Sequence, residues 1–108
     1  MEALPEYLIT EDKVLQELSE ELFLNIENCS LCPHKCGVNR LSNKTGICGA
    51  PVDAVVASYA VHMGEEPPIS GISGSGTIFF SYCTLKCIYC QNYPISQLYN
   101  GKSVTSQD

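Results

Sequence analysis

The sequence is poor in basic residues and contains no long apolar run. Its 6 Lys and Arg residues stand against 12 Asp and Glu, which gives a formal net charge of −6. The basic residues are scattered, so no cluster of them offsets the repulsion that a polyanion such as DNA would meet. No apolar stretch reaches the roughly 18 residues that a membrane span requires. These features argue against a nucleic-acid partner and against a membrane protein.

We also expect no export signal, and the chain is shorter than a large barrel. It begins with the acidic stretch Met1-Glu2-Ala3-Leu4-Pro5-Glu6, whereas a secretory signal begins with basic residues and an apolar run. We therefore expect a cytoplasmic protein. Its 108 residues are enough for one small domain, but a closed (β/α) barrel needs about 200 residues or more. The last residues, 101–108, predict a polar linker that leads into a further helix.

Cysteine is abundant, with 7 residues in 108. A secreted disulfide scaffold would reach a similar density, but the count is odd and no export signal is present. The cysteines also follow one another in short steps of the Cys-x2-Cys and Cys-x3-Cys kind. Such steps are typical of metal chelation in a reducing compartment. We therefore expect thiols that bind metal rather than disulfides.

Three of the cysteines, Cys83, Cys87 and Cys90, form a Cys-x3-Cys-x2-Cys run with Tyr89 just before the last of them. Thiolates hold iron–sulfur clusters, and a ferredoxin-type run supplies a fourth cysteine that this run lacks. Three ligands on a four-iron cluster leave one iron open. An open coordination position is typical of metal sites that perform chemistry. The run therefore predicts a [4Fe–4S] cluster with one open iron.

The other four cysteines lie earlier in the chain, with the spacing Cys-x2-Cys-x3-Cys-x11-Cys: Cys29, Cys32, Cys36 and Cys48. Four sulfurs on short loops are enough to close one tetrahedral metal site or one cluster. Zinc and a [4Fe–4S] cluster both suit this set, so the metal stays open. His34 is an alternative ligand, although a histidine on an exposed loop is more often solvated.

The three-cysteine run and its flanks, 74–81 and 90–96, resemble the radical S-adenosylmethionine (SAM) enzymes. Within that superfamily they resemble the branch named after the pyruvate formate-lyase activating enzyme. The likeness includes the Cys-x2-Cys-Pro-x2-Cys segment with its later Gly-x-Cys-Gly, and the Gly-Glu-Glu-Pro-Pro-Ile-Ser stretch at 64–70. The chain departs from the family at Tyr82 and Thr84, where related sequences often have Gly and Asn.

This resemblance implies an activity. SAM would chelate the open iron through its amino and carboxylate groups, and an electron from the reduced cluster would split the sulfonium. The resulting 5′-deoxyadenosyl radical would abstract hydrogen from a substrate. The resemblance also makes Tyr89 the SAM-binding residue, because the aromatic residue at this position lies beside the adenine, in a contact that owes much to its backbone. The alternative is that Tyr89 only shields the cluster from water. The resemblance makes the enzyme oxygen-sensitive.

The resemblance further implies partners and a larger protein. By analogy with the activating enzyme, the substrate would be a glycyl radical enzyme, and a flavodoxin- or ferredoxin-type protein would be the reductant. The remaining SAM contacts of the family lie on later barrel strands. We therefore expect an N-terminal fragment of a radical SAM enzyme, and an isolated 108-residue chain that is inactive.

A second reading is a non-catalytic module that binds zinc or an iron–sulfur cluster, or transfers electrons, for another chain. In this reading the four-cysteine site is structural zinc or a redox cluster. A zinc ribbon that pairs Cys29/Cys32 with Cys87/Cys90 is one variant. It is weak, because 54 residues separate the two pairs, against about 15–20 in zinc ribbons.

For the fold we expect an α+β fragment in four segments. Residues 1–28 hold an amphipathic helix over 11–26, with Thr10 as its N-cap, because apolar residues recur at helical spacing. Residues 29–50 form the four-cysteine segment. Residues 51–73 and 74–108 hold the connector and the start of the barrel.

Two or three strands are expected, and two of them can be placed in the last two segments. Alternation over 53–63 predicts a strand with His62 on its mixed face, as a surface histidine rather than a ligand. The two prolines within 64–71 predict an extended connector. Residues 77–81 predict a short strand buried on both faces. The resemblance makes this the first strand of a truncated (β/α) barrel, with the cluster loop at its C-terminal end.

Overall fold

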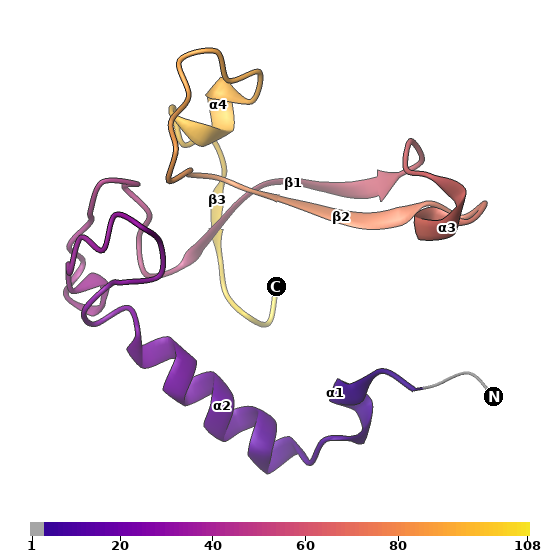
Figure 1. Cartoon of the computed structure of the whole chain (residues 1–108), viewed down its shortest axis with the longest axis horizontal. Helices are drawn as coiled ribbons and strands as arrows, with labels where there is room; N and C mark the ends of the chain where they lie inside the picture. The colour runs from indigo at the N-terminus through magenta and orange to yellow at the C-terminus, as the bar shows by residue number, and fades with distance from the viewer. Residues whose placement is uncertain (1–3) are drawn as a thin grey trace.

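The structure is a computed structural model that describes residues 4–108, so residues 1–3 of the acidic N-terminal stretch lie outside the described residues. The elements follow one another along the chain as shown in Figure 1. They are α1 (Glu6–Ile9), α2 (Asp12–Leu24), η1 (Arg40–Ser42), β1 (Ala54–His62), α3 (Pro67–Ser70), β2 (Ser75–Phe80), α4 (Tyr93–Ser96) and β3 (Lys102–Val104). No helix of the described part of the chain has the length and apolar character to cross a membrane.

Helix α2 corresponds to the helix predicted over 11–26, but Thr10 does not cap it. The N-cap residue is Glu11, whose side chain makes no capping hydrogen bond. Thr10 instead ends α1, because its hydroxyl donates to the carbonyl of Glu6 at 2.8 Å. Its N–H donates to the same carbonyl. The Thr10 prediction is wrong because the carbonyl of Glu6, one turn earlier, accepts hydrogen bonds from both the hydroxyl and the N–H of Thr10.

The three strands form one antiparallel sheet in the order β2-β1-β3. Strands β1 and β2 match the strands predicted over 53–63 and 77–81, and they pair as a hairpin with a register shift between Val56 and Ser58. Strand β3 lies in the segment that was expected to be a linker, and it pairs with the start of β1 through Ala54↔Val104. That prediction is wrong because the free edge of β1 offers unpaired backbone groups to the returning chain.

The connector at 64–71 was expected to be extended, but part of it is helical. Pro67 and Pro68 occupy the first positions of the short helix α3. Proline is tolerated there because its missing N–H would have no partner in the first turn. The turn is completed by Ser70, whose N–H donates to the carbonyl of Glu66 at 3.1 Å. The prolines therefore begin a helical turn.

The described chain buries little apolar surface. Its accessible surface is 8846 Å², whereas a folded monomer of 11.8 kDa exposes about 5900 Å². The radius of gyration is 16.8 Å, against about 13 Å for a compact domain of this length. Among residues 4–108, the buried apolar side chains are Ile26 and Cys29. The core is therefore small and lies at the start of the four-cysteine segment.

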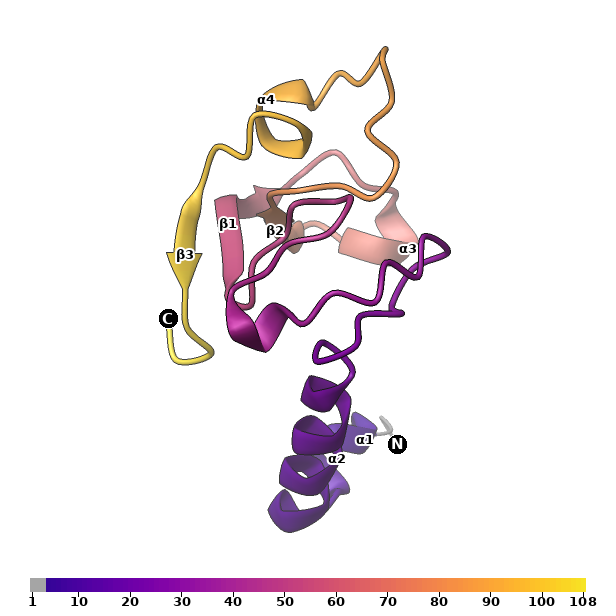
Figure 2. The same ribbon diagram turned by 90° about the vertical axis from the view of Figure 1, so that its left-hand side faces the viewer.

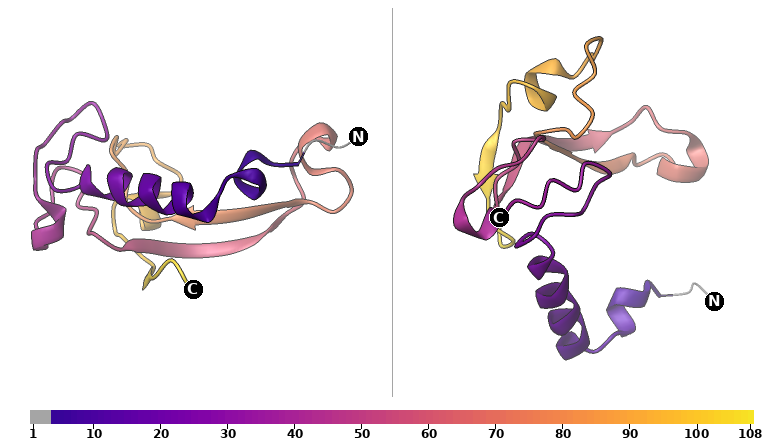
Figure 3. Two further views of the ribbon diagram at one scale, coloured as in Figure 1. Left: turned by 90° about the horizontal axis from the view of Figure 1, so that it is seen from below. Right: turned by 60° about the vertical axis from the view of Figure 1, so that its left-hand side comes forward.

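Strand β2 is not buried on both faces, contrary to the prediction. Ile78 and Phe80 are 58% and 57% exposed. Within residues 4–108, the pairs of elements with extensive contact are β1 with its two neighbouring strands. Helix α2 extends away from the sheet (Figures 1 and 3) and leaves the strands uncovered. The (β/α) barrel that the resemblance implies stays a prediction.

The β1–β2 turn generates a test of this hairpin. Gly74 has φ +79°, and a Cβ there would lie 2.6 Å from both Met63 Sδ and Val61 Cγ1. We expect Gly74→Ala to destabilise the hairpin by about 1–3 kcal/mol, from left-handed backbone strain and steric conflict. The measurement is hydrogen exchange of the β1 and β2 amides.

Gly76→Ala is the matched control for this substitution. A Cβ at Gly76 meets nothing within 4 Å, and its φ lies outside the left-handed region. It should leave the exchange rates within about twofold of the wild type. Equal protection in the Gly74→Ala and wild-type chains would contradict the described turn.

Candidate metal centre

All seven cysteines of the chain are free thiols. Cys29 is buried, and the other six are half-buried. They lie on two segments: residues 29–48 between α2 and β1, and the loop 83–90 that follows β2. Figure 2 shows the first of these segments in magenta and the second in orange. Thiols in these positions are partly shielded yet remain reachable by a metal ion.

The first segment folds back on itself and brings Cys36 to Cys29. The Cys29 N–H donates to Val38 O at 3.1 Å, and the Gly37 N–H donates to Cys29 O at 2.9 Å. This return requires the left-handed backbone of Gly37, with φ +66°. As a result, the Cys36 thiol lies 4.0 Å from the carbonyl oxygen of Cys29.

The Cys36 sulfur lies among hydrogen-bond donors. Its pKa is lowered chiefly by the N–H of Val38, while partial desolvation opposes the shift and the N–H of Ile47 and the Cys29 thiol add to it. Residues 46–48 approach this sulfur closely, because a Cβ on Gly46 would lie 2.5 Å from Cys36 Sγ. The glycine therefore allows the two halves of the segment to meet.

In the second segment, hydrogen-bond donors and a positive charge stabilise the thiolate of Cys83. The N–H groups of Lys86 and Leu85 lower the pKa of Cys83, desolvation raises it, and the nearby Lys86 ammonium lowers it further. The Leu85 N–H lies 3.4 Å from Cys83 Sγ. This loop thus begins with a sulfur that favours its charged form.

The end of the loop is held by α4. Cys90 Sγ lies 3.3 Å from the hydroxyl of the buried Ser96. The Gln97 side-chain amide donates to Cys87 O at 2.7 Å, and the Cys90 N–H donates to the same oxygen at 3.2 Å. Ser96 of α4 and Gln97, the residue after it, therefore contact the last two cysteines, while N–H donors surround the sulfur of the first.

One arrangement recurs in both segments: the N–H two residues further on is directed at the cysteine sulfur. It occurs at Cys48 with the N–H of Ala50 at 3.4 Å, at Cys83 with Leu85, and at Cys36 with Val38. Donors directed at sulfur stabilise the thiolate, which is the form that binds metals. The donor set therefore suits thiolate-bound metal in both segments.

The structure does not bring the predicted ligands to a common point. Within residues 4–108, no three Cys, His, Asp or Glu side chains are gathered closely enough to hold a metal ion. Thiolates repel one another, so convergence of a set requires a cation between them. Metal binding would have to draw the sulfurs of each set inward.

The other predicted site residues lie on the surface. Tyr89 is 86% exposed, so its ring is accessible. His62 Nδ1 lies 3.2 Å from Glu65 Oε1 at the end of β1. His34 is exposed, and its Nε2 lies 2.8 Å from the carbonyl oxygen of Thr84. That contact joins the two cysteine segments across 50 residues.

Tyr82, which stands where the radical SAM enzymes that the chain was expected to resemble often have glycine, takes part in a contact that sequence reasoning missed. It has φ +73°, a backbone conformation that suits glycine and strains tyrosine. Its ring stacks on Tyr99 with centroids 4.3 Å apart. Lys86 Nζ donates to the Tyr99 hydroxyl at 2.7 Å. The departure at Tyr82 was the available signal, but nothing in the sequence pointed to Tyr99.

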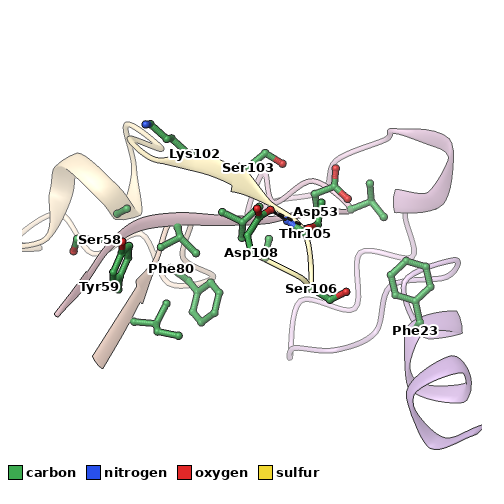
Figure 4. Close-up of a pocket in the computed structure, with 16 residues that line it drawn as sticks. Phe23, Asp53, Ser58, Tyr59, Phe80, Lys102, Ser103, Thr105, Ser106 and Asp108 are labelled. Carbon is green, nitrogen blue, oxygen red and sulfur yellow. Dashed lines mark hydrogen bonds between the residues drawn. The ribbon is translucent and has the colours of Figure 1, made fainter. Parts of the chain in front are cut away.

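A large groove of about 1480 Å³ lies away from the cysteines. Figure 4 shows it between Phe23 of α2 and the strands, with Tyr59 and Phe80 along its wall. Asp108 at its margin accepts hydrogen bonds from the N–H and hydroxyl of Thr105, which lower its pKa. No cysteine lines this groove.

Comparison with known proteins gives a relative but no matching family model. No family model matches the chain, and no solved structure matches it. An uncharacterized protein of Methanocaldococcus jannaschii is 38% identical over 91 residues, which cover 83% of this chain. The chain spans about a quarter of the length of that curated relative (25%). In the relative, the similar segment therefore belongs to a much longer protein.

The donors around Cys83 generate a pH prediction. Since they hold the pKa of Cys83 below the ordinary thiol value, a larger fraction is thiolate at any pH below that value. We expect the alkylation rate of Cys83 to rise with pH through a lower midpoint in the folded chain than in the urea-unfolded chain. Site-resolved mass spectrometry with iodoacetamide measures this. Equal midpoints would contradict the described loop.

Lys86→Gln isolates the contribution of the ammonium. It should slow alkylation of Cys83 at neutral pH by about two- to fivefold, because an exposed charge contributes modestly. Lys102→Gln in β3 removes the same charge from another part of the fold and should have no effect.

Proposed function

We propose that this chain is the N-terminal, cluster-binding segment of a radical SAM enzyme of the branch that resembles the pyruvate formate-lyase activating enzyme. The observation that carries the proposal is the loop after β2. It presents three half-buried free thiols with Cys-x3-Cys-x2-Cys spacing on a backbone held at both ends by hydrogen bonds. Its first sulfur is stabilised as a thiolate.

In this proposal Cys83, Cys87 and Cys90 hold a [4Fe–4S] cluster. When bound, the cluster would supply the electron that cleaves SAM to a 5′-deoxyadenosyl radical for hydrogen abstraction. Tyr89 offers an exposed ring beside the last ligand, on which the adenine of SAM can stack. With Cys90 as a thiolate, the Ser96 hydroxyl, which lies 3.3 Å from Cys90 Sγ, would donate a hydrogen bond to that sulfur.

The four-cysteine segment would hold a second metal, either zinc or an iron–sulfur cluster. Its N–H donors at Cys36 and Cys48 suit either metal, because both bind thiolate. A glycyl radical enzyme as protein substrate, and a flavodoxin- or ferredoxin-type reductant, complete the proposal. The cytoplasm, where thiols stay reduced, is the compartment that this chemistry requires.

The proposal also makes the chain one segment of a larger protein. Two observations support this: the uncovered apolar surface of the sheet, and a relative of which the chain spans 25%. The residues that would complete the SAM site and position a substrate belong to the rest of the barrel. The isolated 108 residues should therefore bind a cluster and SAM weakly, so that filling the site needs excess iron, sulfide and SAM, and they should turn over little or no substrate.

A non-catalytic metal-binding or electron-transfer module is the second candidate. The observation in its favour is the position of the large groove, which lies on the sheet and away from every cysteine. In this reading the chain holds zinc or an iron–sulfur cluster for another protein.

Metal content and SAM response separate the two functions. We expect anaerobically reconstituted chain to bind about four irons or more per molecule, because three thiolates and one exogenous ligand complete a cubane. Its reduced EPR signal should shift when SAM is added. Replacing Cys83, Cys87 or Cys90 with Ala should remove this signal. Zinc without iron, or a signal that is blind to SAM, would contradict the proposal and favour the module.

Tyr89→Ala tests the SAM contact separately from the cluster. Loss of an aromatic stacking surface should weaken the SAM response about fivefold or more, with the iron content unchanged. Tyr89→Phe keeps the ring, and Ile88→Ala alters a neighbour that is 98% exposed. Both should behave as the wild type. An unchanged SAM titration in Tyr89→Ala would remove this role from its side chain.

A further inference from the structure

The two cysteine segments meet on both sides of Cys83. Thr84, which follows Cys83, accepts a hydrogen bond from His34 of the first segment. Tyr82, which precedes Cys83, lies against Gly49, since a Cβ on this glycine would be 3.5 Å from Tyr82 Cδ1. The first ligand of the cluster loop is thus flanked by residues that rest on the four-cysteine segment.

His34 is placed to transmit order from one segment to the other. It lies between two predicted ligands, Cys32 and Cys36, with one residue separating it from each. For its Nε2 to bond the carbonyl of Thr84 at 2.8 Å, Nε2 must carry the proton. The donor therefore moves with the turn that Cys32 and Cys36 define.

The second contact involves the residue next to Cys48. Gly49 has φ +77°, and a Cβ there would lie 3.1 Å from the Tyr99 hydroxyl oxygen. Tyr99 in turn stacks on Tyr82 and accepts a hydrogen bond from Lys86 of the cluster loop. A metal that fixed Cys48 would therefore also fix Gly49, against which Tyr82 and Tyr99 pack.

The cluster loop needs such support because it has little of its own. Leu85, Ile88 and Tyr89 are more than three-quarters exposed, so the loop buries little apolar surface. Ordering an exposed loop costs conformational entropy that its own contacts must offset. If the first segment already holds the backbone at Cys83, less of that cost falls on cluster binding.

We propose that metal binding by the four-cysteine segment orders the three-cysteine loop, with His34 as the positioning residue that couples the two sites. Occupancy of the first site then raises the affinity of the second for its metal. The inference rests on the proposed function for the metal that each of the two segments binds. The coupling itself rests on the contacts of His34 and Gly49.

The test uses the full chain with Cys87→Ser and Cys90→Ser, so that the four-cysteine segment is the one complete thiolate set. One equivalent of Zn²⁺ is added, and hydrogen exchange is followed by mass spectrometry over 82–86. The reporters are the N–H groups of Tyr82 and Leu85, which donate to Ile95 O and Cys83 Sγ. We expect zinc to slow their exchange about two- to tenfold.

The two histidines of the chain supply matched variants. His34→Ala should bind zinc with unchanged stoichiometry but lose the protection over 82–86. His34→Gln, whose amide can donate to the same carbonyl, should restore part of it. His62→Ala removes a histidine that pairs with Glu65 on β1 and should keep the full effect. Partial rescue by Gln separates a hydrogen bond from a general loss of folding.

A second measurement links the coupling to the cluster. In the chain with all seven cysteines, His34→Ala should weaken iron retention against a chelator about two- to tenfold, while His62→Ala leaves it unchanged. If the wild-type chain forms no SAM-responsive cluster but zinc still protects 82–86, the proposed function fails and the coupling stands. If zinc does not bind, or protects 82–86 equally in His34→Ala, the coupling is wrong.

Discussion

Backbone N–H groups directed at cysteine sulfurs are the interaction on which both cysteine segments depend. They recur at Cys36, Cys48 and Cys83, each time from the residue two positions further on. This geometry needs a local turn at each cysteine, so it forms within a few residues and does not require a large core. At Cys36 and Cys83 it lowers the pKa of the thiol, in a chain that buries few side chains. Metal binding and folding are therefore closely linked in this molecule.

The sequence predicted the elements that depend on neighbouring residues. The apolar periodicity of α2 and the alternation of β1 are local properties, and both elements lie close to their expected bounds. The predictions failed where the local structure depends on a partner distant in the sequence, or on one that competes for the same group. Strand β3 forms because β1 offers a free edge. The Thr10 hydroxyl donates a hydrogen bond to the carbonyl of Glu6 and so does not cap α2. The exposure of Phe80 depends on what covers the sheet, which its own segment does not specify.

The candidate site divides in the same way. Cysteine spacing is a local signal, and by itself it divides the thiols into two sets without any information about the residues around them. The contact between His34 and Thr84 spans 50 residues, and no spacing rule reports such a distance. Tyr82 gave a partial signal of an unusual contact, because a tyrosine stands where the radical SAM enzymes that the sequence resembles often have glycine. Its stack on Tyr99 offers a physical reason: the ring contact compensates for a strained, left-handed backbone at φ +73°.

The same shortage of buried surface shapes both the sheet and the cluster loop. An uncovered face with Ile78 and Phe80 exposed gains free energy when another element covers it, and a loop of thiolates gains it when a cation enters. Strand β2 takes part in both gains. It contributes to the sheet, and the chain reaches Cys83 three residues after the strand ends. Covering the sheet would stiffen β2, and a stiffer β2 would hold the start of the cluster loop. The four-cysteine segment contacts the same loop, so the position of Cys83 depends both on β2 and on that segment.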